Sequence, residues 1–229
     1  MEKVLMPFNP QLKDEIEHIR FSIQAEQNGI ASRRMGNEGY KKNYGVTYPV
    51  LKNIAEPYVG NATLASCLWS TGYRETMIIA TLIYPTDKFT EKEATTWLAD
   101  MQCDEIVQYA CMNLYSKMND AENLVTLFYG DTSAKSKDMA YLLAAQLIEN
   151  GNKKFDASTL LNNALNDILK NKSSLPISAA QYLKQLGLHS AFKQQVMNIV
   201  DQAAKSDAMT CRWVAEEVRT FVEYTEPID

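Results

Sequence analysis

The chain has 229 residues, of which 46% are hydrophobic and 22% are charged, and its formal net charge is −5. A chain of this length buries roughly 70% of the surface that it exposes when unfolded, so it can form a sizeable core, and the composition excludes a disordered chain. The negative charge excludes a uniformly basic nucleic-acid binder but leaves room for a local basic surface.

Apolar residues recur at helical spacing along almost the whole chain. The stripes cover residues 12–23, 94–101, 106–118, 139–147, 161–169, 192–203 and 214–222. Steps of three and four residues predict helices with one apolar face each. No convincing alternation of apolar and polar residues occurs. We therefore expect about ten to twelve helices of roughly 10–16 residues and no sheet.

Local signals place several helix ends. Thr90 and Glu93 form a capping-box pattern before the stripe at 94–101. Pro49 and Pro176 fit the first turn of a helix, where proline is tolerated. Gly29 follows an apolar periodic segment and is predicted to be a helix C-cap. No Pro-, Gly- or Ser-rich linker interrupts the series, so one domain over residues 1–229 is expected.

Short amphipathic helices in series form either a globular bundle or an α-solenoid of stacked helix pairs. The predicted pairs follow one another at steps of roughly 35–45 residues, near the period of HEAT and armadillo repeats. This spacing favours the all-α solenoid, an α-α superhelix of HEAT-like repeats.

Four cysteines without regular spacing indicate reduced thiols rather than a disulfide framework. The first ten residues contain no apolar run of signal-peptide length, and no stretch approaches the length of a membrane span. We therefore expect a cytoplasmic protein that does not bind a membrane.

The motifs of common catalytic and cofactor sites are missing from the sequence: it contains no Gly-rich phosphate loop, no His-Glu-x-x-His, no Cys-x-x-Cys and no Gly-x-Ser-x-Gly. His18 and His189 lie on different helical segments and are expected at a surface and a cap. Cys103 and Cys111 could share a helix face, but no histidine or third cysteine lies near them. We predict core thiols there, with no metal and no cofactor.

Two segments are basic within this acidic chain. Residues 31–54 contain five basic residues against one acidic residue, and residues 170–193 contain four basic residues and no acid, so each carries +4 and the remainder carries −13. Such segments could contact phosphates from one surface of a solenoid. The alternative is a set of solvated helix faces. Tyr40, Tyr44 and Tyr48 lie among these charges and could stack on bases, although aromatics at helical spacing more often pack in a core.

Two patterns in the first 85 residues are more specific. One is Tyr-x-x-x-Tyr-Gly-Val-x-x-Pro from Tyr40 to Pro49, and the other is Leu-Trp-x-x-x-x-x-Glu-x-x-x-x-Ala from Leu68 to Ala80. Together they resemble the DNA alkylation repair (AlkD-like) family. The resemblance implies a right-handed stack of HEAT-like repeats with a concave face that binds duplex DNA.

The resemblance also implies a chemistry, because family members include glycosylases that excise N3- and N7-alkylated purines. Such a base is already a cationic leaving group, and the transition state resembles an oxocarbenium ion. A carboxylate near the sugar can stabilise this state and position water without a cofactor.

The family's catalytic segment is altered in this chain. It corresponds to residues 104–108, where Gln108 replaces the catalytic aspartate and Asp104 replaces a tryptophan. Asp104 or Glu105 could supply the carboxylate in a shifted register. Three alternatives therefore stay open: a glycosylase, a protein that recognises lesions or branched DNA without excision, and a non-catalytic scaffold for protein partners. In each case we expect a monomer.

The predicted DNA contacts combine the two basic segments with positions that correspond to the family's arginine and second tryptophan. They are Arg33, Arg34, Lys41, Lys42, Tyr44, Lys135, Lys137, Gln181, Tyr182, Lys184 and Lys193. Within the second motif, Trp69 is expected to pack between repeats, Glu75 to pair with a neighbouring helix or cap, and Arg74 to face solvent.

Overall fold

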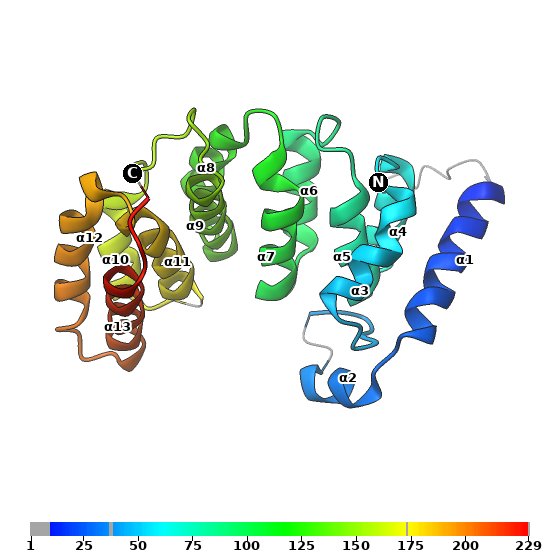
Figure 1. The fold of residues 1–229 in the computed structure, drawn as a ribbon, viewed down its shortest axis with the longest axis horizontal. Helices are drawn as coiled ribbons and strands as arrows, with labels where there is room; N and C mark the ends of the chain where they lie inside the picture. The colour runs from blue at the N-terminus through cyan, green and yellow to red at the C-terminus, as the bar shows by residue number, and fades with distance from the viewer. Residues whose placement is uncertain (1–9, 37–38, 173, 229) are drawn as a thin grey trace. The chain divides into compact units, whose positions relative to one another are not determined.

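The computed structural model describes residues 10–36, 39–172 and 174–228. These residues form helices joined by short loops, and the only β-type pairing among them is an isolated bridge between Lys42 and Tyr73. The α-helices are α1 (Pro10–Ala25), α2 (Gly29–Met35), α3 (Tyr48–Ala55), α4 (Ala62–Ser70), α5 (Arg74–Ile83), α6 (Glu91–Asp100), α7 (Asp104–Asn113), α8 (Ala121–Gly130), α9 (Ala134–Glu149), α10 (Leu161–Lys170), α11 (Leu175–Gly187), α12 (Ser190–Ala203) and α13 (Met209–Tyr224), as Figure 1 shows. Two short 3₁₀ helices, η1 (Glu56–Tyr58) and η2 (Tyr115–Lys117), complete them.

The all-α prediction is confirmed, and the described residues contain thirteen α-helices, slightly more than expected. Successive helix pairs begin at Ala62, Glu91, Ala121, Leu161 and Ser190, so three of the four steps are 29 or 30 residues. These steps are shorter than the predicted period, because the helices are mostly about ten residues long.

The chain divides into two compact units, Met1–Leu114 (unit 1) and Tyr115–Asp229 (unit 2). In unit 1, α5 packs against α3, α4 and α7, while α1 contacts α3 and α4. Every residue of α5 except Leu82 is buried, so this helix forms the centre of the unit.

Tryptophan stacking joins two helix pairs of unit 1. The ring of Trp69 on α4 stacks on the ring of Trp97 on α6, with centroids 4.0 Å apart and planes 9° apart. The indole N–H of Trp69 donates a hydrogen bond to Asp100 at 3.1 Å. This packing confirms the prediction that Trp69 lies between repeats.

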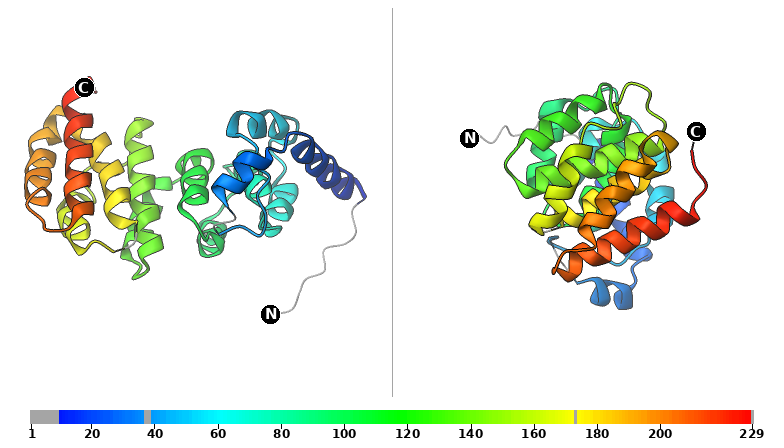
Figure 2. Two further views of the ribbon diagram at one scale, coloured as in Figure 1. Left: turned by 90° about the horizontal axis from the view of Figure 1, so that it is seen from below. Right: turned by 90° about the vertical axis from the view of Figure 1, so that its left-hand side faces the viewer.

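In unit 2, α11 is the central helix, because it contacts α9, α10, α12 and α13. Figure 2 shows the last helix, α13, alongside α11 and α12. The contacts of α11 with α13 advance together along both helices, from Lys184 with Glu217 to Gly187 with Val222, so the two helices run parallel.

The predicted helix ends are mostly confirmed. Thr90 and Glu93 form a complete capping box, and Pro49 and Pro176 lie in the first turns of α3 and α11. The prediction for Gly29 is wrong, because this residue begins α2 instead of ending α1.

None of the described helices combines the length and hydropathy that a membrane span requires. All four cysteines are free thiols. Within the described residues, no three histidine, cysteine or acidic side chains gather as metal ligands.

Candidate functional site

The two motifs that carry the family resemblance meet in space. Glu75, at the start of α5, is fully buried, and its carboxylate accepts hydrogen bonds from the backbone N–H groups of Tyr44 at 3.1 Å and Val46 at 3.3 Å. A carboxylate that accepts backbone N–H groups in a buried site orders the chain that carries them. Glu75 was expected to pair with a helix or cap, and it fixes the loop at 44–46 instead.

Arg74 links this loop to α7. Its Nε and Nη2 atoms donate to the carboxylate of Glu105 at 2.8–3.1 Å, and its Nη1 atom donates to the carbonyl of Val46 at 2.9 Å and to Glu75 at 3.2 Å. Only 4% of Arg74 is exposed, so the prediction that it faces solvent is wrong. Burial disfavours the charge on Arg74, but the hydrogen bonds and charge of Glu105 and the charge of Glu75 prevail and raise its pKa.

The first turn of α7 holds the residues predicted to carry catalysis. Asp104 is exposed at the first position, and Gln108 is exposed one turn later. Glu105 lies between them in sequence and is partly covered, with 32% of its side chain exposed. Besides the two-pronged contact with Arg74, Glu105 accepts a hydrogen bond from the hydroxyl of Tyr40 at 2.9 Å. Both of its carboxylate oxygens are therefore engaged.

A pocket of about 320 Å³ opens beside this cluster and is lined in part by Tyr40, Arg74, Cys103, Asp104 and Glu105. Burial, a hydrogen bond with Cys103 and the charge of Glu105 raise the pKa of Tyr40, so its hydroxyl stays protonated and can donate. Within the lining the two carboxylates outnumber the one guanidinium. The pocket is thus not built to hold a phosphate.

A tyrosine pair covers the centre of unit 1. Tyr48 on α3 stacks on Tyr109 on α7, with ring centroids 4.8 Å apart. The Tyr48 hydroxyl donates to Asn113 at 2.6 Å, and the amide of Asn113 donates to Thr81 of α5 at 2.9 Å. Sequence reasoning missed Tyr109 and Asn113, although a polar Asn113 within the apolar stripe at 106–118 was a usable signal.

The predicted DNA contacts of unit 1 are four basic residues and Tyr44. Arg33 and Arg34 are exposed on α2, and Lys41 and Lys42 are exposed on the loop that follows. Only 8% of Tyr44 is exposed, and the ammonium of Lys42 lies 4.3 Å from its ring centroid. The prediction that Tyr44 stacks on DNA is therefore wrong, because its ring is already covered.

In unit 2, Lys135 and Lys137 lie half-buried in the first turn of α9, and the ammonium of Lys137 lies 4.8 Å from the ring centroid of Tyr129. Lys184 on α11 forms an ion pair with Glu217 at 3.2 Å. Part of its charge is therefore balanced within the protein.

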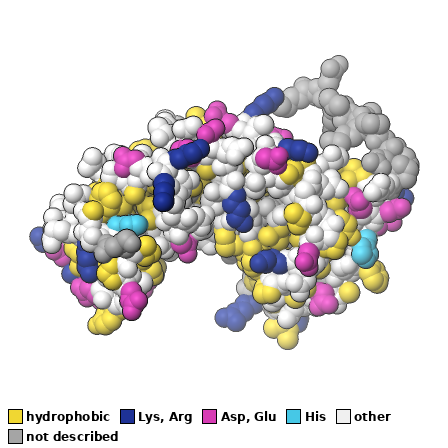
Figure 3. Space-filling view, turned by 45° about the horizontal axis from the view of Figure 1, so that its top comes forward, with side chains coloured by type: hydrophobic (Ala, Val, Ile, Leu, Met, Phe, Trp, Pro, Cys, Tyr) yellow, Lys and Arg dark blue, Asp and Glu magenta, His cyan; other side chains and the backbone are white. Residues whose placement is uncertain are grey.

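The remaining predicted contacts of unit 2 differ in exposure. Lys193 is exposed on α12, and Gln181 is half-buried on α11. Tyr182 is fully buried, and its hydroxyl donates to the carbonyl of Ala157 at 2.5 Å. The prediction that Tyr182 contacts DNA is wrong, since its ring belongs to the core. Figure 3 shows the basic side chains dispersed among uncharged and acidic ones on the visible face.

Unit 2 also buries a carboxylate that sequence reasoning did not single out. Asp167 is 1% exposed, and it accepts hydrogen bonds from the hydroxyls of Tyr129 at 2.6 Å and Tyr141 at 2.9 Å. Lys170 pairs with it at 3.5 Å. Lys170, one of the four lysines in the second basic segment, therefore balances the charge of a buried carboxylate.

Comparison with known proteins bears on the family and the fold of this chain. The family model described as DNA alkylation repair enzyme matches residues 22–191. No curated protein matches the chain. A solved structure described as "a new family of proteins related to the HEAT-like repeat DNA glycosylases with affinity for branched DNA structures" is similar to this chain with a TM-score of 0.76 and 13% identity, over 93% of this chain and 98% of that one. The likeness shows a shared HEAT-like repeat fold, and the family match shows that the chain belongs to the DNA alkylation repair enzyme family.

Proposed function

We propose that this protein binds DNA through exposed basic side chains and that it releases no alkylated base through a carboxylate of α7. The observation that carries the proposal is that the carboxylate of Glu105 is already occupied by hydrogen bonds within the protein. Both oxygens of this carboxylate accept hydrogen bonds from Arg74, and one also accepts from Tyr40.

Base excision in this family needs an anionic group close to the sugar, because positive charge develops there in the transition state. The charge of Glu105 is balanced by Arg74 at 2.8 Å, and Gln108 has no charge. Asp104 is exposed at the N-terminus of α7, where water screens a carboxylate strongly. In the first two turns of α7, no side chain therefore provides an unbalanced negative charge that is protected from water and could stabilise the developing cation.

The case for DNA as the ligand rests on unit 1 and on family membership. Arg33, Arg34, Lys41 and Lys42 are exposed and close in sequence, and Arg side chains bind phosphates in a two-pronged geometry. A protein of the same fold is described as having affinity for branched DNA structures. Branched DNA is therefore the first ligand to compare with linear duplex.

Two assays on the natural protein test the proposal. Fluorescence anisotropy should show binding to a labelled duplex, weakening as salt rises. Incubation with methylated duplex should release no 7-methylguanine or 3-methyladenine above the rate without protein. The Asp104→Ala variant should behave like the natural protein in both assays. Base release that Asp104→Ala abolishes would contradict the proposal, and so would a lack of DNA binding.

The Gln108→Asp variant probes the same site from the other direction. If the substitution places an anion where the family has one, it can add base release without changing DNA affinity. Gln102→Asp is the matched control, because Gln102 is also exposed and lies just before α7. Release by both variants would show that any added acid suffices, and would contradict the role assigned to this position.

A second candidate is a scaffold for protein partners, which α13 favours. Three large apolar side chains are exposed there: Met209 at 78%, Trp213 at 51% and Tyr224 at 85%. Apolar side chains that remain exposed on one helix are typical of protein interfaces. If α13 serves a protein partner, Trp213→Ala leaves DNA affinity unchanged; a loss of DNA affinity would assign α13 to the DNA instead.

A further inference from the structure

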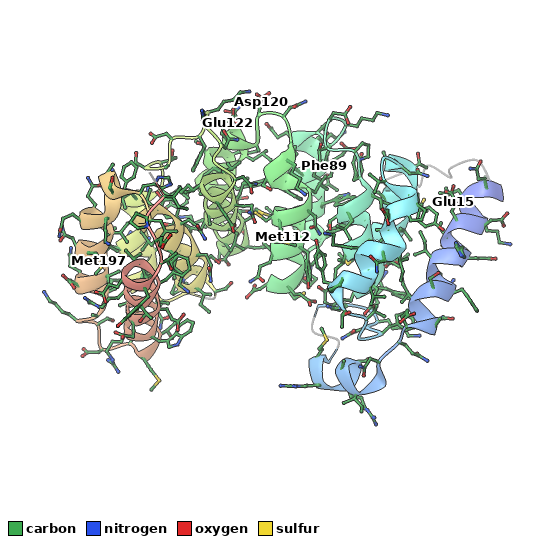
Figure 4. The ribbon with its side chains drawn as sticks, viewed as in Figure 1. Glu15, Phe89, Met112, Asp120, Glu122 and Met197 are labelled. Atoms are coloured by element: carbon green, nitrogen blue, oxygen red, sulfur yellow. The ribbon has the colours of Figure 1, made fainter. Side chains whose placement is uncertain are left out.

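Helix α2 differs from the other α-helices of unit 1, because none of its residues is buried. Ile30 is 75% exposed, and both Arg33 and Arg34 are exposed. These three residues occupy positions i, i+3 and i+4, so they share one face of the helix. Within the part of the chain that the structure describes, neither guanidinium forms an ion pair with a carboxylate. Figure 4 shows the side chains of α2 projecting outward from the ribbon.

Both ends of α2 are nevertheless fixed. The side-chain oxygen of Asn28 accepts hydrogen bonds from the first turn, at 3.1 Å from the N–H of Ile30. Ser32 donates to the carbonyl of Asn43 at 2.7 Å, and the amide of Asn43 donates to the carbonyl of Gly36 at 2.8 Å. A seven-residue helix is too short to persist alone in water, so these contacts keep it folded.

The loop that holds α2 is itself rigid. Gly45 has φ of +74°, and a Cβ atom there would lie 2.5 Å from the carbonyl of Asn28 and 2.6 Å from the N–H of Ser32. The neighbouring N–H groups of Tyr44 and Val46 are held by the buried carboxylate of Glu75. A continuous set of polar contacts therefore runs from the centre of unit 1 to α2, and α2 presents its exposed face without adding to the core.

An exposed isoleucine with two arginines one turn further along the same helix face complements DNA whose bases are accessible. Arginines bind the backbone phosphates, while an apolar side chain such as isoleucine can insert between base pairs and unstack them. In an intact linear duplex this insertion must break base stacking. At a branch point the stack is already interrupted, so the same insertion costs less.

We propose that α2 is the element that selects branched DNA: Ile30 inserts at the unstacked step of the branch, and Arg33 and Arg34, one helical turn further along the same face, bind the phosphates beside it. This inference rests on the proposed DNA-binding function and adds the residues that choose branched DNA over linear duplex. The charge of α2 supports DNA as the occupant, since the helix carries two arginines and no acid.

The experiment measures Kd by fluorescence anisotropy for a three-way junction and for a linear duplex with the same number of nucleotides. The natural protein should prefer the junction at least about tenfold, because unstacking a base step is a substantial cost that the junction avoids. Ile30→Ala should bring the ratio of the two Kd values close to one and leave the Kd for linear duplex unchanged. Val59→Ala is the matched control, because Val59 is a β-branched aliphatic residue of the same unit with 68% exposure.

The arginines should behave differently from Ile30. The double variant Arg33→Gln/Arg34→Gln should weaken binding to both DNA molecules and reduce the slope of log K against log salt by about 1.8, or about 0.9 for each lost phosphate contact. Lys88→Gln/Lys92→Gln is the charge-matched control on exposed positions of the same unit and should change neither quantity.

A 2-aminopurine base at the branch point reports insertion directly. The natural protein should raise its fluorescence by unstacking it, and Ile30→Ala should not. All variants should keep the far-UV circular dichroism and thermal midpoint of the natural protein, since the replaced side chains are exposed.

The outcomes separate the two proposals. Absence of DNA binding overturns the proposed function and this inference together. Equal binding of junction and linear duplex by the natural protein overturns only the inference. So does a junction preference, or a 2-aminopurine signal, that survives in Ile30→Ala.

Discussion

Removing the carboxylate of Glu75 should strongly lower the stability of unit 1. The side chain is fully buried, and it accepts hydrogen bonds from the N–H groups of Tyr44 and Val46 and from Arg74. In Glu75→Ala all three donors lose an acceptor in a site closed to water.

The magnitude follows from those contacts. Each buried N–H left without an acceptor costs about 1–3 kcal/mol. Removing one partner of a buried ion pair costs about 3–5 kcal/mol, although Arg74 keeps Glu105 as a second partner. Because these contributions overlap, we expect Glu75→Ala to lower the free energy of unfolding by about 3–5 kcal/mol in total.

Urea unfolding followed by tryptophan fluorescence measures this loss. The measurement uses a Trp213→Phe background, where the two remaining tryptophans, Trp69 and Trp97, both report on unit 1. Asp87→Ala is the control, because Asp87 is an exposed carboxylate of the same unit, and it should change stability by less than about 0.5 kcal/mol. A loss below about 1 kcal/mol in Glu75→Ala would refute the assigned role of its contacts.

Two further predictions concern backbone geometry and pH. In the same urea assay, Gly45→Ala should lower the free energy of unfolding by at least about 2 kcal/mol more than Gly60→Ala. Both glycines have a positive φ, but of the two only Gly45 has other atoms, such as the carbonyl oxygen of Asn28, where a Cβ would lie. An equal loss of stability in the two variants would contradict this steric argument. Burial is the largest cause that raises the pKa of Tyr141 and the pKa of Tyr182 above the ordinary value of 10.0. As the pH rises above 10, both hydroxyls therefore stay protonated in the folded protein, while they ionise in the unfolded chain. Their contribution to stability is complete below pH 10 and is lost as pH rises from there, at about 1.4 kcal/mol per pH unit for each tyrosine. Thermal unfolding between pH 9 and pH 11.5 checks the slope, which Tyr141→Phe should reduce, and a flat profile would contradict it.

The elements that sequence reasoning predicted well are those with local signals. Thr90 and Glu93 lie three residues apart, and Pro49 and Pro176 restrict only their own turns, so each prediction needed no distant contact. The all-α class followed in the same way from the period of the apolar residues.

The errors have two different origins. Arg74 was placed in solvent because its partner Glu105 lies 31 residues later, and no local pattern shows that pairing. Tyr182, by contrast, carried a local signal. Ala179, Tyr182, Leu183 and Leu186 form an apolar stripe at helical spacing, which predicts a core position. The DNA contact was predicted instead from the correspondence of this position to the family's second tryptophan and from the neighbouring Lys184.

The candidate site shows the same division. The motif residues Tyr44 and Glu75 are 31 positions apart, and the backbone N–H of Tyr44 donates to the side-chain carboxylate of Glu75. The spacing of the motifs alone does not reveal this contact. Arg33 and Arg34 were predicted as DNA contacts, but the helix that carries them was not predicted, because Gly29 was expected to end a helix. Asn28 begins a new helix there through its side-chain cap, and only its contact geometry distinguishes the two cases.

The enclosure of α5 has a consequence for the order in which unit 1 opens. Amide hydrogens exchange with solvent when a segment opens locally, and segments with the most buried contacts open last. The backbone of α5 should therefore exchange at the rate of global unfolding of the unit, while α2, which buries none of its side chains, should exchange through small local openings. Local opening of α2, which is exposed to solvent, can thus occur without opening α5, which forms the centre of the unit.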